Sequence, residues 1–302
     1  MWTDRQPAYH NRLHIERVPA QTIALLVDYG VPPAALGVDR LFEQRYLQWS
    51  GTGPVCLNGA ASANVSRPGL ERALFGLAES CGVKFCIGAV PYAAIADPAR
   101  LLFDATGRAG VTAARRWRPA NPVVSRTFQF TASPAPHHAT LALAAGSEGY
   151  AYRLGNRHGL CLGVVGGRDL IRGQWPEIRE RIVRFAPWIV SGLPGADGQA
   201  GRAGACSLQW ADAGPRAILI GDAAIARDAL SSQGLAMGLG AALHAVSKAV
   251  IGSTPGPQRN GPVQRAEHAR RVLAMISAAA FGSQPLWKEY GGFLQKAAMK
   301  LA

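Results

Sequence analysis

The chain has 302 residues, of which 48% are hydrophobic and 17% are charged, and this composition predicts a folded protein with a sizeable core and excludes intrinsic disorder. The formal net charge of +13 is compatible with an anionic partner. The basic residues are scattered, however, without interleaved aromatic residues or a nucleic-acid-binding motif, so nucleic acid is disfavoured as a ligand.

Hydropathy and cysteine usage indicate a cytoplasmic protein. The N-terminus is polar and no run of about 18 apolar residues occurs, so neither a signal peptide nor a membrane span is predicted. The five cysteines form no Cys-x-x-Cys pair, which favours reduced thiols over a metal site or a disulfide framework. Cys81 and Cys86, on either side of a short extended segment, are expected to be small buried residues.

The first part of the chain alternates between helical and extended patterns. Apolar residues at helical spacing predict a helix over residues 19–31 that closes at Gly30. A second helix is predicted over residues 66–83, with Ser66 as its N-cap and Gly82 at its end. Buried strands are predicted for residues 83–90 and 99–108.

From about residue 121 the hydrophobic period changes to that of strands. Short alternating runs separated by turn residues predict an antiparallel sheet, followed by a helix over residues 174–193 with a proline near its end. A strand, a loop and a helix from Gly234 to Ile251 then return to the first pattern, and amphipathic helices follow from Val263. The sequence therefore predicts an α/β protein with an inserted antiparallel sheet.

The segment AILIGDAAIARDALSSQGLAMGLG, residues 217–240, combines a buried strand, an acidic turn, a polar loop and a glycine-opened helix. Gly221 permits close backbone approach at the carboxyl end of the strand, where ligands of open α/β sheets bind. Asp222 is an acceptor suited to a ribityl or ribose hydroxyl, and the loop before Gly234 offers N–H groups for developing negative charge. On the residues alone, a flavin site and an ordinary strand–turn–helix crossover with a capping serine remain equally good interpretations.

Several motifs resemble those of one protein family. The string GDAAIARDALSSQGLAMGL resembles the second FAD motif of the single-component flavoprotein monooxygenases, in the branch of the tryptophan halogenases and of the hydroxylase-like flavoproteins that mature tryptophylquinone cofactors. LLFDATGRAGVTAAR resembles the segment near the cofactor pyrophosphate, with Asp104 and Gly107 at its fixed positions. SRPGLERAL resembles the segment in which an arginine, here Arg67, contacts the cofactor. HIERVPAQTIALLVDYGV is similar to the helix after the first FAD loop, with Glu16 and Pro19 in matching positions.

The resemblance implies an FAD-binding, glutathione-reductase-like α/β fold with an inserted antiparallel substrate-domain sheet and C-terminal helices. The family's strand–GxGxxG–helix opening has no counterpart here, so the N-terminal βαβ unit and its pyrophosphate cradle are expected to be missing. Truncation of a longer flavoprotein, loss of FAD binding and completion by another polypeptide remain open interpretations. The implied domains are residues 1–120 (first, incomplete part of the FAD-binding domain), 121–200 (substrate-binding sheet and helix), 201–253 (return to the FAD-binding domain) and 254–302 (linker and C-terminal helices).

The activity implied by the resemblance is FAD-dependent monooxygenation (hydroxylation) of an aromatic substrate, such as tryptophan, free or within a partner protein. NAD(P)H or a separate flavin reductase would supply the electrons. Halogenation is disfavoured, because Tyr150 and Tyr152 stand where the halogenase branch carries tryptophans and Lys84 lies in a different context from its catalytic lysine. The alternative is a truncated, non-catalytic flavoprotein scaffold that acts as a binding or maturation partner.

No catalytic side chain is assigned, because the oxygen chemistry of this family resides on the flavin. Weaker substrate candidates lie on the predicted sheet, where a half-exposed sheet face is the competing interpretation: Tyr150, Tyr152, Arg153 and His158. The expected cofactor-binding residues are Arg67, Asp104, Gly107, Gly221, Asp222, Ser231, Ser232, Gln233 and Gly234.

Overall fold

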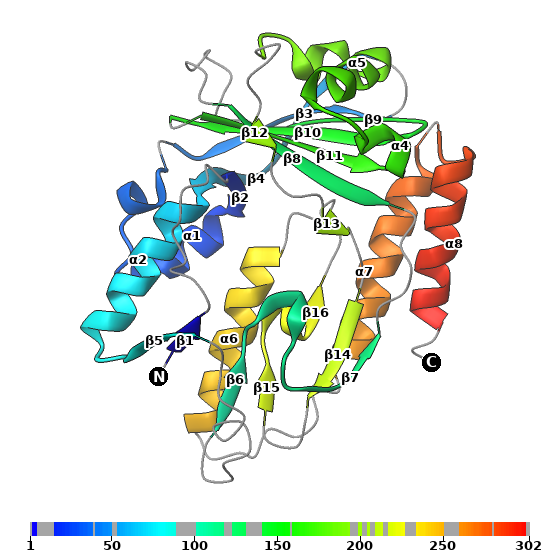
Figure 1. The fold of residues 1–302 in the computed structure, drawn as a ribbon. Helices are drawn as coiled ribbons and strands as arrows, with labels where there is room; N and C mark the ends of the chain where they lie inside the picture. Colours follow the sequence, from blue (N-terminus) through cyan, green and yellow to red (C-terminus); the bar gives the residue numbers. More distant parts are fainter. Residues whose placement is uncertain are drawn as a thin grey trace. The chain divides into compact units, whose positions relative to one another are not determined.

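The computed structural model resolves the chain into two compact units, each built from two segments that are distant in sequence. One unit comprises Met1–Val90 and Val124–Gly204, and the other comprises Pro91–Val123 and Ala205–Ala302. Figure 1 shows the elements of both units in sequence colours. The structure describes residues 2–4, 15–38, 40–49, 53–88, 101–117, 123–130, 141–157, 159–193, 199–200, 204–205, 209–213, 217–226, 234–250, 260–279 and 281–299.

The first unit is organised around a nine-stranded sheet with the order β12-β8-β11-β10-β9-β3-β4-β2, in which β13 also pairs with β8. The predicted antiparallel sheet is confirmed, because β8, β9, β10 and β11 pair in antiparallel register, whereas β3 pairs with β9 in parallel. The strands are β2 (Ile15–Pro19), β3 (Phe42–Gln48), β4 (Val55–Ser66), β8 (Val124–Phe130), β9 (Leu141–Gly146), β10 (Gly149–Asn156), β11 (Gly159–Gly166), β12 (Gln199–Ala200) and β13 (Gly204–Ala205).

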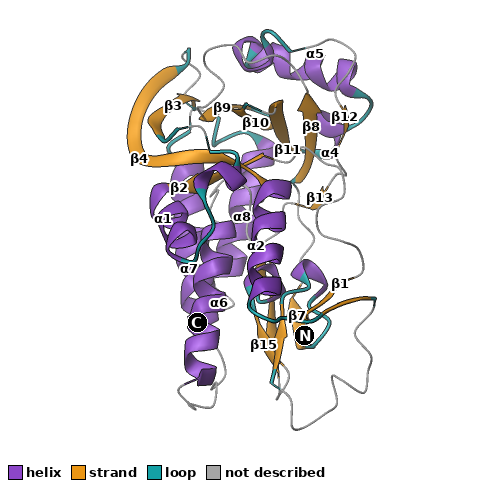
Figure 2. Ribbon diagram, turned by 90° about the vertical axis from the view of Figure 1, so that its left-hand side faces the viewer, coloured by secondary structure: helices purple, strands orange, loops and turns teal. Residues whose placement is uncertain are grey.

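The sequence did not predict β3 and β4, which extend this sheet beyond β9. β4 has the sequence VCLNGAASANVS, in which small and polar residues outnumber the β-branched residues that favour strands. Figure 2 shows β4 as a long curved ribbon beside β3. The pairing of these strands with their neighbours, rather than their own propensity, therefore determines their structure.

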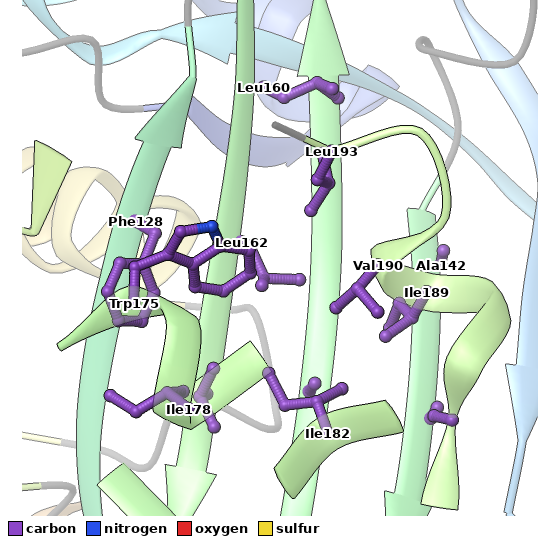
Figure 3. Close-up of a cluster of buried hydrophobic side chains, with 14 of the residues drawn as sticks. Phe128, Ala142, Leu160, Leu162, Trp175, Ile178, Ile182, Ile189, Val190 and Leu193 are labelled. Atoms are coloured by element: carbon purple, nitrogen blue, oxygen red, sulfur yellow. The ribbon is translucent and has the colours of Figure 1, made fainter. Parts of the chain in front are cut away.

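One face of the sheet is covered by the helices that follow β11, namely α4 (Arg168–Ile171), α5 (Trp175–Phe185) and the 3₁₀ helix η3 (Pro187–Val190). The Trp175 ring packs on Phe128 and Phe130 with centroid distances of 4.8 and 5.1 Å, and Ile178 and Ile182 face the same core (Figure 3). The helix predicted for residues 174–193 ends at Phe185, because Pro187 lacks a backbone N–H and begins η3 instead.

The opposite face of the sheet carries a smaller apolar cluster, composed of Ile15, Phe42, Leu141, Leu154 and Cys161, with Tyr152 packed against it. Three further helices of this unit are α1 (Ala20–Asp28), α2 (Arg67–Ser80) and the 3₁₀ helix η1 (Pro33–Leu36).

The predicted boundaries of α2 are confirmed. The Ser66 side chain accepts a hydrogen bond from the backbone N–H of Gly69 at 3.2 Å, and Gly82 follows the helix with φ of 79°. The predicted burial of Cys81 and Cys86 is wrong, because both are exposed. Cys86 lies on β5 (Phe85–Ile87), which, among the described strands, pairs with β1 (Trp2–Asp4) alone in a two-stranded parallel sheet.

The second unit contains a pair of parallel strands, a three-stranded antiparallel sheet and three long helices. Helices α7 and α8 pack together and bury Trp287, Tyr290 and Leu294. Among the helices of the described residues, none is both long and apolar enough to cross a membrane. The elements are β6 (Leu102–Asp104), η2 (Gly107–Ala109), β7 (Ala113–Trp117), β14 (Gln209–Ala213), β15 (Ala217–Leu219), η4 (Gly221–Ala223), β16 (Ile225–Ala226), α6 (Gly234–Val250), α7 (Asn260–Ser277) and α8 (Pro285–Met299).

Candidate functional site

Two predicted site segments meet at one edge of the parallel strand pair in the second unit. β6 and β15 pair in parallel with Leu219 opposite Asp104, and the backbone N–H of Ile220 donates to the Asp104 carbonyl at 2.9 Å. A 3₁₀ turn follows each strand, η2 after β6 and η4 after β15, and the two turns contact each other. We call the residues Asp104, Gly107, Gly221 and Asp222 at this edge the strand-end site.

Asp104 is the buried centre of the loop that follows β6, with only 2% of its surface exposed. Its Oδ1 accepts hydrogen bonds from the backbone N–H and the hydroxyl of Thr106 at 2.9 and 2.6 Å. Its Oδ2 accepts from the backbone N–H and the hydroxyl of Thr112 at 2.8 and 2.7 Å. Both carboxylate oxygens are thus used within the loop, so Asp104 shapes the loop that would present backbone groups to a ligand.

These four hydrogen bonds also determine the ionisation of Asp104. Burial by itself raises the pKa of a carboxyl, because it disfavours the charged form. The hydrogen bonds from Thr106 and Thr112 favour the carboxylate and outweigh that effect, so the pKa of Asp104 lies below its usual value. Asp104 is therefore a stable anion at neutral pH and is not suited to proton transfer.

The glycines of the strand-end site have the backbone conformation that side chains disfavour. Gly107 and Gly221 have φ of 62° and 58°, in the left-handed region. A Cβ added at Gly107 would meet no atom within 4 Å, whereas one at Gly221 would lie 3.8 Å from the Cα of Gly238 on α6. The glycines therefore make the turn after β6 open and bring the turn after β15 close to α6.

Asp222 provides a polar group at this edge, and Gly234 begins the helix that packs against it. Asp222 is exposed in the first turn of η4, directly after β15, as the strand–acid–helix pattern predicts. Gly234 is the first residue of α6, is exposed and would accommodate a Cβ without meeting any atom within 4 Å. Ser231, Ser232 and Gln233 lie outside the described residues, so their place at the site stays a prediction.

Arg67 belongs to the first unit, where it forms a network with two glutamates. Its Nη1 lies 3.0 Å from Glu16 Oε1 and its Nε lies 2.6 Å from Glu71 Oε1. Burial lowers the pKa of an arginine, but the two carboxylates outweigh this effect, so the pKa of Arg67 is raised. The side chain joins β2 to the first turn of α2, and its contact with a cofactor stays a prediction.

The substrate candidates on β10 fall on two faces of the sheet. Tyr150 is buried, and the Tyr152 ring lies over Gly163, where an added Cβ would be 2.0 Å from the ring. Arg153 lies on the other face and donates to the carbonyls of Ile189 and Ser191 at 3.3 and 3.2 Å, which holds η3 against the sheet. His158 lies outside the described residues.

Sequence reasoning missed the threonines that complete the Asp104 loop and the Glu71 partner of Arg67. The Asp-x-Thr spacing in DATG could have identified Thr106, since such side chains commonly bond to the backbone two residues away. Glu71 is four residues after Arg67 on a helix, the spacing at which ion pairs form.

Comparison with solved structures shows which known fold the chain has. No protein-family model matches the sequence, and no curated protein sequence matches it. The structural neighbours are flavin-dependent halogenases and a tryptophan dihydroxylase, so the chain has the fold of the halogenase-like FAD flavoproteins. The predicted α/β fold class and the predicted resemblance are thereby confirmed at the level of the fold.

Three of these structures illustrate the likeness. The peptidyl tryptophan dihydroxylase QhpG, essential for tryptophylquinone cofactor biogenesis, has a TM-score of 0.66 and 21% identity over 93% of this chain and 71% of its own. The flavin-dependent brominase Bmp2 has a TM-score of 0.72 and 14% identity over 99% of this chain and 85% of its own. The myxobacterial chondrochloren halogenase CndH has a TM-score of 0.72 and 15% identity over 99% of this chain and 83% of its own.

Proposed function

We propose that this protein is a flavin-dependent hydroxylase-like oxidoreductase that acts on an aromatic substrate, either tryptophan or a tryptophan side chain within another protein. The strand-end site carries the proposal, because two parallel strands end together in glycine turns beside a helix. The fold adds support, since it is shared with a peptidyl tryptophan dihydroxylase and with flavin-dependent halogenases.

The residues of the strand-end site fit an FAD cofactor. Gly107 leaves open space where a side chain would project, and Gly234 does the same at the start of α6, so neither residue places a side chain in the way of a bound molecule. Asp222 is an exposed acceptor suited to the hydroxyls of the ribityl chain, and Asp104 holds the Gly107 loop in shape. When bound, FAD would supply the activation of oxygen, which no amino-acid side chain provides.

The remaining task of the protein is to bind and orient the aromatic substrate. The face of the sheet opposite α5 carries Tyr152 with the apolar cluster of Ile15, Phe42 and Leu141. An apolar face with an aromatic ring suits an indole or a phenol, because such faces bind aromatic rings by burial and edge or stacking contacts. Arg153 belongs to the opposite face, so we assign it a structural role.

Hydroxylation and halogenation are the two reactions named for structures that share this fold. The resemblance of the sequence places Tyr150 and Tyr152 where the halogenase branch carries tryptophans, and this difference favours hydroxylation. The electron source would be NAD(P)H or a separate flavin reductase. A cytoplasmic location belongs to the same proposal, supported by the exposed free thiols of Cys56, Cys81 and Cys86.

A titration with FAD followed by turnover tests the proposal. The full chain is titrated with FAD, and binding is followed by the visible absorption and fluorescence of the flavin. It is then incubated with a flavin reductase, NADPH, oxygen and chloride, and with either tryptophan or a tryptophan-containing peptide. We expect mass spectrometry to show a product whose mass is increased by that of oxygen atoms, whereas a chlorinated product would assign halogenation. Absence of any FAD binding would contradict the enzyme and favour the non-catalytic scaffold.

A further inference from the structure

Two arginines that the proposed function does not use converge over β4 in the first unit. Arg17 lies on β2, and its Nε donates to the hydroxyl of Ser62 on β4 at 2.9 Å. Arg45 lies on β3, on the other side of β4, and its guanidinium lies directly over Gly59, where an added Cβ would be 1.4 Å from Nη2. The two side chains therefore reach over the same strand from opposite sides.

Strand register places both arginines on the face of the sheet opposite α5. Arg45 is paired with Leu141, and residues paired across neighbouring strands project to the same face. Arg17 is two residues after Ile15 and shares its face, since side chains alternate along a strand. Leu141 and Ile15 both belong to the apolar cluster that includes Tyr152. The arginine pair thus borders the face to which we assign the aromatic substrate.

The positive charge of this pair has no acidic partner among the described residues. Glu16 projects to the other face of β2 and pairs with Arg67, and Glu43 on β3 forms no ion pair with either arginine. The Nε of Arg45 is buried and has no hydrogen-bond partner. The pKa of Arg17 is lowered, mainly because the side chain is partly buried and to a smaller extent because Arg45 carries a like charge nearby. Two half-buried guanidinium groups that repel each other destabilise a fold unless an anion joins them.

We propose, on the basis of the proposed function, that Arg17 and Arg45 form a binding site for a carboxylate of the substrate. Guanidinium groups suit this ligand, because their planar donors match the two oxygens of a carboxylate. The Ser62 hydroxyl accepts from Arg17 Nε and donates to the carbonyl of Phe42, so it holds the Arg17 side chain in place. The carboxylate would come either from free tryptophan or from acidic residues that flank a tryptophan in a partner protein. The substrate class is therefore an aromatic residue that carries or adjoins a carboxylate.

A structural role and an anion-binding role predict opposite effects of removing Arg45. A structural arginine stabilises the protein, so its loss lowers the melting temperature. Arg45→Met keeps the contact with Gly59 but removes the repulsion from Arg17 and the buried unpaired donor, so we expect its melting temperature without added anion to be equal to or above that of the parent protein. Arg72→Met is the matched control, because Arg72 is exposed on α2.

The test is thermal unfolding of the full chain in acetate, in inorganic phosphate and in chloride at equal ionic strength. We expect acetate to raise the melting temperature saturably for the parent protein and Arg72→Met, since a ligand that binds the native state stabilises it. For Arg45→Met, acetate affinity is expected to fall at least about tenfold. The proposal is overturned if acetate does not raise the melting temperature of the parent protein saturably, or if only phosphate does. It is also overturned if Arg45→Met responds to acetate as the parent protein does, or if its melting temperature without added anion is lower than that of the parent protein.

Three further ligands distinguish the source of the carboxylate and separate this proposal from the proposed function. Stabilisation by N-acetyltryptophan but not by its amide assigns the terminal carboxylate. Stabilisation only by a blocked peptide with glutamates beside tryptophan assigns acidic flanking residues. If acetate binds but none of the tryptophan ligands does, the anion site stands without a tryptophan substrate, which overturns the assignment to substrate. These measurements require neither FAD nor turnover, so a failure of the flavin chemistry leaves them interpretable.

Discussion

Asp104 and Thr112 are joined by two hydrogen bonds, from the backbone N–H and the hydroxyl of Thr112 to Oδ2 at 2.8 and 2.7 Å, and these bonds close the loop that contains Gly107. Thr106 binds the other oxygen of the same carboxylate, and its hydroxyl also accepts from the backbone N–H of Val111 at 3.1 Å. The loop therefore depends on one buried carboxylate, and its shape can be tested by changing that group alone.

Replacement of Asp104 by asparagine is expected to destabilise the protein by about 2–3 kcal/mol, because the amide places a donor against donors and removes charge-assisted hydrogen bonds. Urea unfolding followed by circular dichroism measures this free energy. Asp28→Asn, at the exposed end of α1, is the control and is expected to change stability by less than about 0.5 kcal/mol. A variant Asp104→Asn as stable as the control would show that the loop does not depend on the carboxylate.

The contribution of Asp104 to stability is expected to depend on pH. Since its pKa is lowered in the folded state, the stabilisation is complete above the ordinary value of 3.8 and is lost as pH falls through the folded pKa. The difference in unfolding free energy between the parent protein and Asp104→Asn should therefore be constant near neutral pH and shrink below about pH 4. A difference that shrinks as pH rises instead would contradict the lowered pKa.

Gly221 and Gly238 face each other, but only Gly221 needs to be glycine. Gly221→Ala is expected to cost about 1–2 kcal/mol, because φ of 58° is strained for a residue with a Cβ. Gly238→Ala places its Cβ at an ordinary 3.8 Å from Gly221 and should stabilise α6 by about 0.5–1 kcal/mol. Chemical denaturation of both variants checks the contrast, and equal losses would show that close packing rather than backbone conformation selects these glycines.

Asp222 is expected to act on cofactor affinity rather than on stability. Asp222→Asn should weaken FAD binding about tenfold, since a charged acceptor to a ligand hydroxyl becomes neutral, while the melting temperature changes little because the side chain is exposed. Fluorescence titration with FAD measures the affinity. Glu79→Gln, an exposed acid on α2, controls for the change in net charge. Equal affinities of parent and Asp222→Asn would remove Asp222 from the cofactor site.

Local signals in the sequence were sufficient for several elements. Ser66 and Gly82 delimit α2 because a cap acts on backbone groups only a few residues away. The alternation from about residue 121 onward predicted an antiparallel sheet, since each strand shows its own period of two. The apolar run followed by an acid predicted that Asp222 lies in the turn after β15, and this too is a pattern of neighbouring residues.

Contacts between distant segments decided the rest. β4 carries little strand propensity, and the exposure of Cys86 depends on what pairs with β5. Tyr152 and Arg153 lie on opposite faces of the sheet, and only the packing of α5 on one face decides which of the two contacts the helices.

The sequence by itself determined where strands and helices of strong local pattern lie, and it identified the strand, acid and glycine helix start that resemble a flavin motif. Only the tertiary structure brought Leu219 beside Asp104 and laid Arg17 and Arg45 over β4. The reason is physical. Capping and periodicity act between neighbours in the chain, whereas strand register and the pairing of charges follow from which distant segments bury each other's apolar surface.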